Sequence, residues 1–305
     1  MKNYKEIFDT IVKQTAKYIT DNNLKAMVLG ISGGIDSTVV AAICYEVSIL
    51  TGVPLIGRSL PTKYNKKDEV STARLVGNAF CNSFTEVPIK SIYDTFQTVV
   101  MTNEGTSTPL SRGNIQARLR MIYLYNLAGI MRGLVMDTDN LTENNLGYFT
   151  IHGDVGDIKP IGNLWKTEVF ELAQWLLSHY SFQIPHNMYE ATSEQLEKAG
   201  KIFQQGKAIK ESLKLKPTAG LGITSNDLEE LGAESYEQVD EILKSIIIYR
   251  DNFYGTTKDD YVNHIIKCDV FPNIPKEVIN NIATKHFISD FKRNPVKVIS
   301  NEYIV

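Results

Sequence analysis

The first half of the chain alternates between short apolar runs and longer stretches in which apolar residues recur at helical spacing. The short runs predict parallel strands at 26–29, 52–60 and 133–136, of which 26–29 is apolar throughout as in a strand buried on both faces, and the alternation at 85–89 predicts another strand. The longer stretches predict helices at 3–20, beyond residue 37, and at 66–80, 91–101, 113–130, 166–177, 236–249 and 276–286. Strands that alternate with helices indicate an α/β fold, a doubly wound parallel sheet with flanking helices that binds ligands at the carboxyl ends of its strands.

The segment from Ser32 to Ser37 (SGGIDS) joins the first predicted strand to the next predicted helix. Its glycines let the backbone turn tightly and approach a ligand, and the helix N-terminus offers free N–H groups and the positive end of the dipole. The spacing matches neither the G-x-x-x-x-G-K-[ST] loop of kinases and GTPases nor the G-x-G-x-x-G loop of dinucleotide-binding folds. A plain Ser- and Gly-rich turn capped by Asp36 is the alternative. The order of serines, glycines and aspartate directly after a strand favours a phosphate-binding loop.

Composition and charge narrow the class of protein. The 305 residues are 43% hydrophobic and 22% charged, as in ordinary globular proteins, and the length predicts one large α/β domain, with or without an appendage. The net charge of −3 gives no general electrostatic argument for a nucleic-acid partner. Cys44, Cys81 and Cys268 are scattered without C-x-x-C spacing, which indicates reduced thiols in a cytoplasmic protein rather than a zinc site. The polar N-terminus is unlike a signal peptide, and no apolar run approaches the ~20 residues of a membrane span, so no membrane partner is expected.

Several segments spread along the chain carry a family resemblance. SGGIDS resembles the pyrophosphate loop of the ATP pyrophosphatases, which cleave ATP to AMP and pyrophosphate while they adenylate a substrate. The other segments follow in the family's order: GNIQARLR (113–120), TDNLTE (138–143), LGYFT (146–150), PIGNLWKTEVFELA (160–173), KPTAGL (216–221) and SDFKRNP (289–295). On these segments the chain resembles the ammonia-dependent NAD synthetases nearly end to end. The resemblance implies a Rossmann-like sheet of the ATP pyrophosphatase, or adenine nucleotide alpha-hydrolase, type.

The resemblance also implies how the chain is organised. It predicts a single NAD synthetase domain over residues 1–305, with an ATP pyrophosphatase core at 26–180, a helical insertion at 186–212 and a C-terminal helical part at 213–305 that completes the substrate site. The length leaves no room for an attached glutamine-hydrolysing domain, so ammonia, free or from a separate partner, is the expected nitrogen donor. In the family the site is shared across a homodimer, and a homodimer is therefore expected.

The implied reaction is the ATP- and Mg²⁺-dependent amidation of deamido-NAD to NAD. The nicotinate carboxylate attacks the α-phosphorus of ATP to give an adenylate and pyrophosphate, and ammonia then displaces AMP. Loop amides and the hydroxyls of Ser32 and Ser37 suit a pyrophosphate group. Hard carboxylate oxygens suit Mg²⁺, which offsets the phosphate charge in the transition state.

The expected site residues follow from the matching positions of the family. ATP is expected to contact Gly30, Ile31, Ser32, Gly33, Gly34, Ile35, Asp36, Ser37, Thr138, Lys166 and Thr218. Mg²⁺ is expected at Asp36 and Glu143, and Asp36 and Lys166 are the expected catalytic residues. Deamido-NAD is expected to contact Arg118, Asp157, Phe291 and Lys292. A guanidinium such as that of Arg118 can grip a phosphate or carboxylate with two hydrogen bonds, whereas Arg120 fits a surface or a subunit interface equally well.

The chain departs from the family on one side of this site. Where the family has F-T-K-[YF]-G-D-G-G-x-D, Ile151 replaces the lysine expected to hold deamido-NAD, His152 replaces the aromatic residue and Val155 replaces a glycine, with one residue fewer before Asp157. Asp137 stands where a glycine usually precedes Thr-Asp, and it adds a negative charge beside the polyphosphate site. One lost charge-assisted hydrogen bond weakens binding roughly ten- to a hundredfold.

Three functions therefore remain open. The first is NAD synthesis by a diverged enzyme. The second is an ATP pyrophosphatase relative that adenylates another carboxylate or a tRNA acceptor, although the chain lacks the basic domain, the aromatic-basic patch and the cysteine pair that suit tRNA modification. The third is a nucleotide-binding module that retains the ATP loop without turnover.

Overall fold

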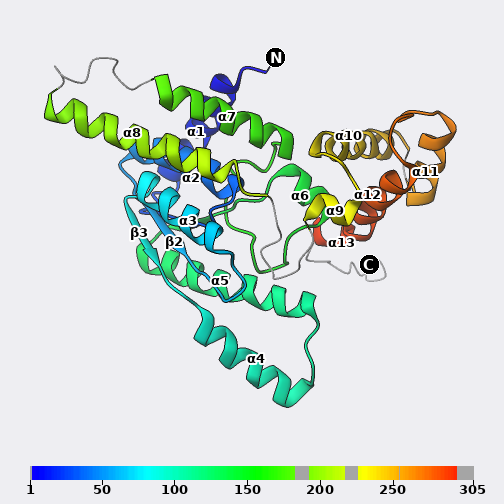
Figure 1. Ribbon diagram of the computed structural model, residues 1–305, viewed down its shortest axis with the longest axis horizontal. Helices are drawn as coiled ribbons and strands as arrows, with labels where there is room; N and C mark the ends of the chain where they lie inside the picture. Colours follow the sequence, from blue (N-terminus) through cyan, green and yellow to red (C-terminus); the bar gives the residue numbers. More distant parts are fainter. Residues whose placement is uncertain (1, 183–191, 217–225, 254, 294–305) are drawn as a thin grey trace, which may run out of the picture.

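The computed structural model describes residues 2–182, 192–216, 226–253 and 255–293 of the 305-residue chain. Within these ranges, a four-stranded parallel sheet has the order β3-β2-β1-β4 (Figure 1). The strands are β1 (Met27–Gly30), β2 (Leu55–Ser59), β3 (Ser83–Glu86) and β4 (Leu134–Met136). β1 is an inner strand, because it pairs with β2 on one side and with β4 on the other.

Helices make up most of the remaining described structure. They are α1 (Tyr4–Asp21), α2 (Ile35–Thr51), α3 (Lys67–Phe80), α4 (Lys90–Glu104), α5 (Pro109–Met131), α6 (Leu141–Leu146), α7 (Lys166–Phe182), α8 (Ser193–Ser212), α9 (Asp227–Leu231), α10 (Tyr236–Asn252), α11 (Lys258–Lys267), α12 (Lys276–Ile288) and α13 (Asp290–Arg293). The sheet and α1 to α8 form one part of the molecule, and α9 to α13 lie beside it (Figure 1).

Helices cover both faces of the sheet, as in a doubly wound fold. Successive side chains of a strand point to opposite faces. Met27 and Leu29 of β1 therefore pack with the helices α1, α2, α3, α7 and α8, whereas Val28 packs with Leu124 and Ala128 of α5. The three β1 side chains are fully buried, which explains why the strand is a continuous apolar run in the sequence.

The C-terminal helices have a hydrophobic cluster of their own. Leu231, Ile242, Tyr261 and Ile282, from α9, α10, α11 and α12, are all fully buried in it. Leu146, the last residue of α6, belongs to the same cluster. The cluster thus anchors α6 at the junction between the sheet and the C-terminal helices.

The predicted strands and helices are present, with several changes. The third strand occupies 83–86 rather than 85–89, and the helices predicted at 91–101 and 113–130 are longer, because α4 continues to Glu104 and the Thr108 side chain caps α5 at its start. The helical insertion predicted at 186–212 corresponds to α8, and residues 183–191 lie outside the described ranges. The helices α6, α9 and α11 are additional to the predicted ones. Among the described residues, no helix is both long and apolar enough to cross a membrane.

Candidate active site

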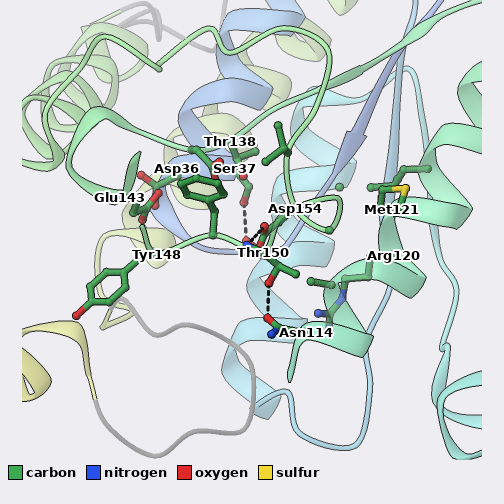
Figure 2. A pocket seen from close by; sticks show the side chains of 18 of the residues that line it. Asp36, Ser37, Asn114, Arg120, Met121, Thr138, Glu143, Tyr148, Thr150 and Asp154 are labelled. Atoms are coloured by element: carbon green, nitrogen blue, oxygen red, sulfur yellow. Dashed lines mark hydrogen bonds between the residues drawn. The ribbon is translucent and has the colours of Figure 1, made fainter. Parts of the chain in front are cut away.

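A cavity of about 700 Å³ opens where the loops after β1, β2 and β4 meet helix α5 (Figure 2). The connections from β1 to β2 and from β2 to β3 lead to one side of β1, whereas β4 joins the sheet on its other side. The loops after β1 and β4 therefore diverge, and open parallel sheets bind their ligands at such a divergence. Gly30, Ile31 and Thr138, three of the residues predicted to contact ATP, line the cavity.

The loop from Ser32 to Ser37 contributes hydroxyl groups to the cavity wall. Ser32 and Ser37 line the cavity with their hydroxyls 3.0 Å apart. The Gly34 N–H donates to the Ser32 hydroxyl at 3.2 Å. Gly33 has a φ of +89°, and a Cβ at this position would lie 2.4 Å from the Glu69 carbonyl oxygen of α3. Only glycine fits this turn, so Gly33 shapes the loop without lining the cavity itself.

A buried ammonium group joins the two predicted magnesium ligands. Lys166, the first residue of α7, is 1% exposed, and its Nζ lies 2.6 Å from Asp36 Oδ2 and 3.0 Å from Glu143 Oε1. Asp36 and Glu143 line the cavity, and 17% and 20% of their side chains are exposed. The fold brings together charged groups from α2, α6 and α7, which are far apart in the sequence.

Burial and charge set the protonation states of this cluster. Burial and the neighbouring Asp36 carboxylate raise the pKa of Glu143 to about 7, against the opposing effect of Lys166. Burial alone lowers the pKa of Lys166, but the charges of Asp36 and Glu143 outweigh it and hold that pKa well above its usual value. Lys166 is therefore charged at neutral pH, and it keeps together two carboxylates that otherwise repel each other.

Asn140 belongs to this cluster although the motif comparison does not identify it. Its Nδ2 donates to Asp36 Oδ1 at 2.9 Å, and its Oδ1 accepts from the Glu143 N–H at 3.0 Å. The Glu143 carboxylate accepts from the Asn140 N–H in return, which completes a capping box at the start of α6. The N-x-x-E pattern was the available sequence signal. One capping residue thus orients both predicted magnesium ligands.

The oxygen donors of this cluster fit Mg²⁺. Proteins commonly hold Mg²⁺ with one or two carboxylates together with substrate phosphates. Asp36 and Glu143 supply two such carboxylates beside a phosphate-type loop. Among the described residues, no three His, Cys, Asp or Glu side chains are arranged to hold a metal ion by themselves. The donor set therefore suits a cation that arrives with a nucleotide.

Two of the residues predicted for deamido-NAD line the cavity. Phe291 is 64% exposed there, and the Lys292 ammonium donates to the Gly147 and Phe149 carbonyls at 2.6 and 2.7 Å. These two hydrogen bonds of Lys292 hold the segment after α6 against the C-terminal helices, and the Lys292 side chain also forms part of the cavity wall. Thr218, predicted to contact ATP, lies outside the described residues.

Arg118 and Asp157 lie outside the lining of this cavity in the described structure. The Arg118 guanidinium donates to the Ile151 carbonyl at 3.3 and 3.4 Å. Asp157 Oδ2 accepts from the Val135 N–H at 2.8 Å, so its carboxylate holds the loop to the edge strand β4. The contact of these two residues with deamido-NAD stays a prediction.

Asp137, the departure from the family pattern beside Thr138, is buried and paired. The residue is 1% exposed, and its Oδ2 lies 3.3 Å from Lys159 Nζ. Its carboxylate also accepts the N–H groups of Asp139 and Gly156, each at 2.7 Å. The charge expected beside the polyphosphate site is thus paired within the protein, and Asp137 holds the loop around residue 156 against the end of β4.

The opposite wall of the cavity consists largely of α5. Asn114, Arg120 and Met121 project from this helix, across from Asp36 and Glu143 (Figure 2). Arg120 Nε donates to the Leu60 carbonyl at 3.0 Å, and burial lowers the pKa of Arg120. Arg120 is thus a half-buried member of the cavity wall that ties α5 to the loop after β2, rather than an exposed surface residue.

Comparisons with known proteins agree with this geometry. The family model described as NAD synthase matches residues 7–296. The NH(3)-dependent NAD(+) synthetase of Thermoplasma acidophilum is 30% identical over 298 residues, which cover 96% of this chain and 97% of that protein. The corresponding enzyme of Methanococcoides burtonii is 32% identical over 240 residues, which cover 78% of each protein.

Solved structures show the same fold. The NMN synthetase of Francisella tularensis superimposes with a TM-score of 0.71 at 25% identity, over 99% of this chain and 100% of that one. The NH3-dependent NAD synthetase of Campylobacter jejuni, solved with the nitrate ion, gives a TM-score of 0.66 at 23% identity, over 98% of this chain and 100% of that one. With a family match over nearly its whole length and the SGGIDS loop at the switch point of its sheet, the chain belongs to the NAD synthase family.

Proposed function

We propose that the chain converts deamido-NAD to NAD with ATP and ammonia, and releases AMP and pyrophosphate. One observation carries the proposal: the SGGIDS hydroxyls, Asp36 and Glu143 line one cavity at the switch point of a parallel sheet, and the buried Lys166 ammonium pairs with both carboxylates. Curated relatives named NH(3)-dependent NAD(+) synthetase, at 29% to 38% identity, support the same reaction. The enzyme is a ligase that forms a C–N bond.

The main chemical difficulty is that a carboxylate must approach a polyphosphate. Ser32 and Ser37 offer hydroxyl donors, and the start of α2 offers free N–H groups and the positive end of its dipole. The Lys166 ammonium lies directly behind this wall, paired with Asp36 and Glu143, and adds positive charge near the point where negative charge builds up as pyrophosphate departs. These groups are fixed before ATP binds, so little reorganisation is needed during the reaction.

Magnesium is part of the proposal. When bound by Asp36 and Glu143, Mg²⁺ supplies charge neutralisation for the phosphates. In the described structure the Lys166 ammonium provides the only positive charge that an ion pair brings to these two carboxylates. Asp36 and Glu143 would hold Mg²⁺ together with the ATP phosphates, so ATP and metal are expected to bind together.

The remaining walls suit the dinucleotide. Asn114, Arg120, Thr150 and Asp154 offer polar groups across the cavity from the pyrophosphate loop (Figure 2). Lys292 adds a positive charge, and the exposed ring of Phe291 offers an aromatic face for a base or the nicotinate ring.

Pyrophosphate release tests this function directly. Purified protein is incubated with ATP, Mg²⁺ and ammonium, with and without deamido-NAD, while pyrophosphate and NAD are measured in the same tube. We expect equal amounts of pyrophosphate, AMP and NAD, and only when deamido-NAD is present. ATP binding without any turnover contradicts the enzyme and leaves a nucleotide-binding module.

A mononucleotide acceptor is a second candidate. The family's lysine for deamido-NAD is Ile151 here, and of the two solved structures described above, the one with the higher TM-score is named NMN synthetase. Both reactions amidate a nicotinate carboxylate, and they differ in whether the acceptor carries an adenylate half. The ratio of kcat/KM for deamido-NAD to that for nicotinate mononucleotide, measured at saturating ATP, decides between them.

The proposal includes a cytoplasmic homodimer. Several apolar side chains of α4 and of the start of α5 are exposed: Ile92 at 54%, Phe96 at 45%, Val99 at 55% and Leu110 at 60%. α4 extends from the body of the molecule (Figure 1), and such a surface suits a second copy of the chain. The cysteines of the described structure are free thiols, which suits a reducing compartment.

A further inference from the structure

The inner end of α8 contacts the pyrophosphate loop behind the cavity wall. Ser212, the last residue of α8, is fully buried, and its hydroxyl donates to the Gly33 carbonyl at 3.1 Å. The Ser212 Oγ also lies 2.7 Å from Thr38 Oγ1, and the Thr38 hydroxyl donates to the Gly34 carbonyl at 2.9 Å. Each hydroxyl has one proton, so the pair makes two of these three hydrogen bonds at a time: either both carbonyls are held, or one is held while the hydroxyls bond to each other.

These contacts fix the direction of the loop amides. A peptide unit is planar and trans, so its N–H points away from its C=O. Because the Gly33 carbonyl points to Ser212, the Gly34 N–H points away from α8, where it donates to the Ser32 hydroxyl on the cavity wall. The Gly34 carbonyl likewise points to Thr38, and the Ile35 N–H points the opposite way at the start of α2.

The position of Ser212 is set by the packing of α8. One face of the helix is buried through Ala199, Ile202, Ala208 and Ile209, and it packs mainly against α3 and α7. α3 also contacts the loop, because the Glu69 carbonyl leaves no room for a side chain at Gly33. The loop is thus fixed both by α3 and by the end of α8.

We propose that Ser212 is a positioning residue for the pyrophosphate loop: through the Gly33 carbonyl and Thr38, it aims the loop amides at the β- and γ-phosphates of ATP. This role gives a function to α8, which the sequence identifies only as part of an insertion. The proposal rests on the ATP-dependent reaction proposed above, and it concerns the affinity for pyrophosphate groups rather than the affinity for adenosine or the overall stability of the fold.

Equilibrium binding of ATP, inorganic pyrophosphate and AMP, measured calorimetrically with Mg²⁺, tests the proposal. In Ser212→Ala we expect the Kd of ATP and of pyrophosphate to rise roughly five- to thirtyfold, as for a lost hydrogen bond that leaves a buried carbonyl unpaired. The Kd of AMP, which lacks the leaving phosphates, is expected to change less than about twofold. Ser212→Cys, which keeps a weak donor of similar size, is expected to recover part of the loss.

Two further variants keep the test decisive. Thr38→Val removes the other hydroxyl at nearly constant volume, and its effect combined with Ser212→Ala is expected to be less than the product of the two single effects, because both act on one network. Ser48→Ala is the matched control: it is 7% exposed on α2, and its hydroxyl donates to Asn82 far from the loop. It is expected to leave all three affinities unchanged.

The outcomes separate this proposal from the proposed function. The positioning role is overturned if the affinities for AMP and for pyrophosphate fall equally. It is also overturned if neither Ser212→Ala nor Thr38→Val lowers the affinity for pyrophosphate. If Ser212→Ala does not fold, Ser212→Cys takes its place, because Thr38→Val leaves the Gly34 carbonyl with its bonds from the Thr38 N–H and the Ser37 hydroxyl. An unaltered protein that binds neither ATP nor pyrophosphate contradicts the proposed function itself.

Discussion

Lys166 carries a charge that is buried before any substrate arrives. Its ammonium group is the cation shared by Asp36 and Glu143, at 2.6 and 3.0 Å. Breaking a buried ion pair by removing one partner is costly, because it leaves the other charge without compensation. Lys166 is therefore expected to matter for stability as well as for turnover.

Lys166→Met tests both roles. We expect turnover to fall at least about a hundredfold, as for the loss of a preorganised charge at the reacting phosphates. The free energy of unfolding is expected to fall by about 3 kcal/mol at neutral pH. Urea denaturation and steady-state kinetics measure the two effects. Lys244→Met, in which the lost ammonium is exposed over the Trp165 ring, is the control, and an equal effect there contradicts the role of the buried charge.

Ile151, which stands in place of the family's lysine, allows a test in which a charge is added rather than removed. Ile151→Lys returns a cation to the position that the family pattern assigns to deamido-NAD. If the absence of this lysine only weakens binding, the KM of the Ile151→Lys variant for deamido-NAD is expected to fall roughly tenfold, which is the contribution of one charge-assisted hydrogen bond. The KM for nicotinate mononucleotide is expected to change little. Ile248→Lys, at a position 62% exposed on α10, controls for the added charge. An unchanged KM means that another group has replaced the lysine.

At the scale of elements, C-terminal helices hold the segment that carries Glu143. His286 of α12 is 2% exposed, and its Nδ1 contacts the Asn145 carbonyl at the end of α6 at 3.1 Å. Arg293 donates to the same carbonyl at 2.8 Å, and Arg250 contacts the other ring nitrogen of His286 at 3.0 Å. The ring is therefore neutral, with Nδ1 as donor and Nε2 as acceptor.

This network predicts a loss of stability in acid. Burial, followed by the charges of Arg293 and Arg250, lowers the pKa of His286 from 6.5 to about 4. The unfolded chain then binds a proton that the folded one does not, so stability is complete above pH 6.5 and falls as the pH drops toward 4. The full effect is about 3 kcal/mol, of which about 2 kcal/mol is lost by pH 5.

Urea denaturation at pH 7.5 and pH 5 measures this effect. His286→Asn, whose amide can still donate to the Asn145 carbonyl, is expected to lose less stability between the two pH values than the unaltered protein, by about 2 kcal/mol. His264→Asn replaces an exposed histidine of α11 and is expected to retain the full pH dependence. The same pH dependence in both variants contradicts the role of His286.

A second prediction at the scale of elements concerns the tight turn at Gly33, between β1 and α2. Gly33→Ala places a Cβ 2.4 Å from the Glu69 carbonyl oxygen at a positive φ. We expect the free energy of unfolding to fall by about 2 kcal/mol and the affinity for ATP to fall more than about tenfold, because the loop has to move. Gly200→Ala, in open space on α8, is the control and is expected to stabilise the fold by up to about 1 kcal/mol.

For the molecule as a whole, the sequence predicts local structure better than contacts. β1, β2 and β4 are visible as mainly apolar runs and β3 by its alternation, whereas α6 and α9 escape detection because they are short and are defined by their caps. Asp36 and Lys166 are 130 positions apart, and only the family motif unites them before the fold is known. No pattern predicts that Ser212 contacts Gly33, because a single buried serine leaves no periodic signal.

Assembly is the largest-scale prediction. If a second copy covers the apolar side chains of α4 and α5, Phe96→Glu places a charge in that interface and is expected to convert the dimer to a monomer, as judged by analytical ultracentrifugation. Phe203→Glu is the matched control, because Phe203 is also an exposed aromatic residue, 62% exposed on α8.

The ligand affinities of the monomeric variant then show whether the dimer completes the site. The pyrophosphate loop, Asp36, Glu143 and Lys166 come from one chain, so ATP is expected to bind the Phe96→Glu monomer with nearly unchanged affinity. The Kd of deamido-NAD is expected to rise more than about tenfold, because part of a shared site is lost. A Phe96→Glu protein that is still dimeric places the interface elsewhere, and a monomer that binds both substrates normally means that each chain holds a complete site.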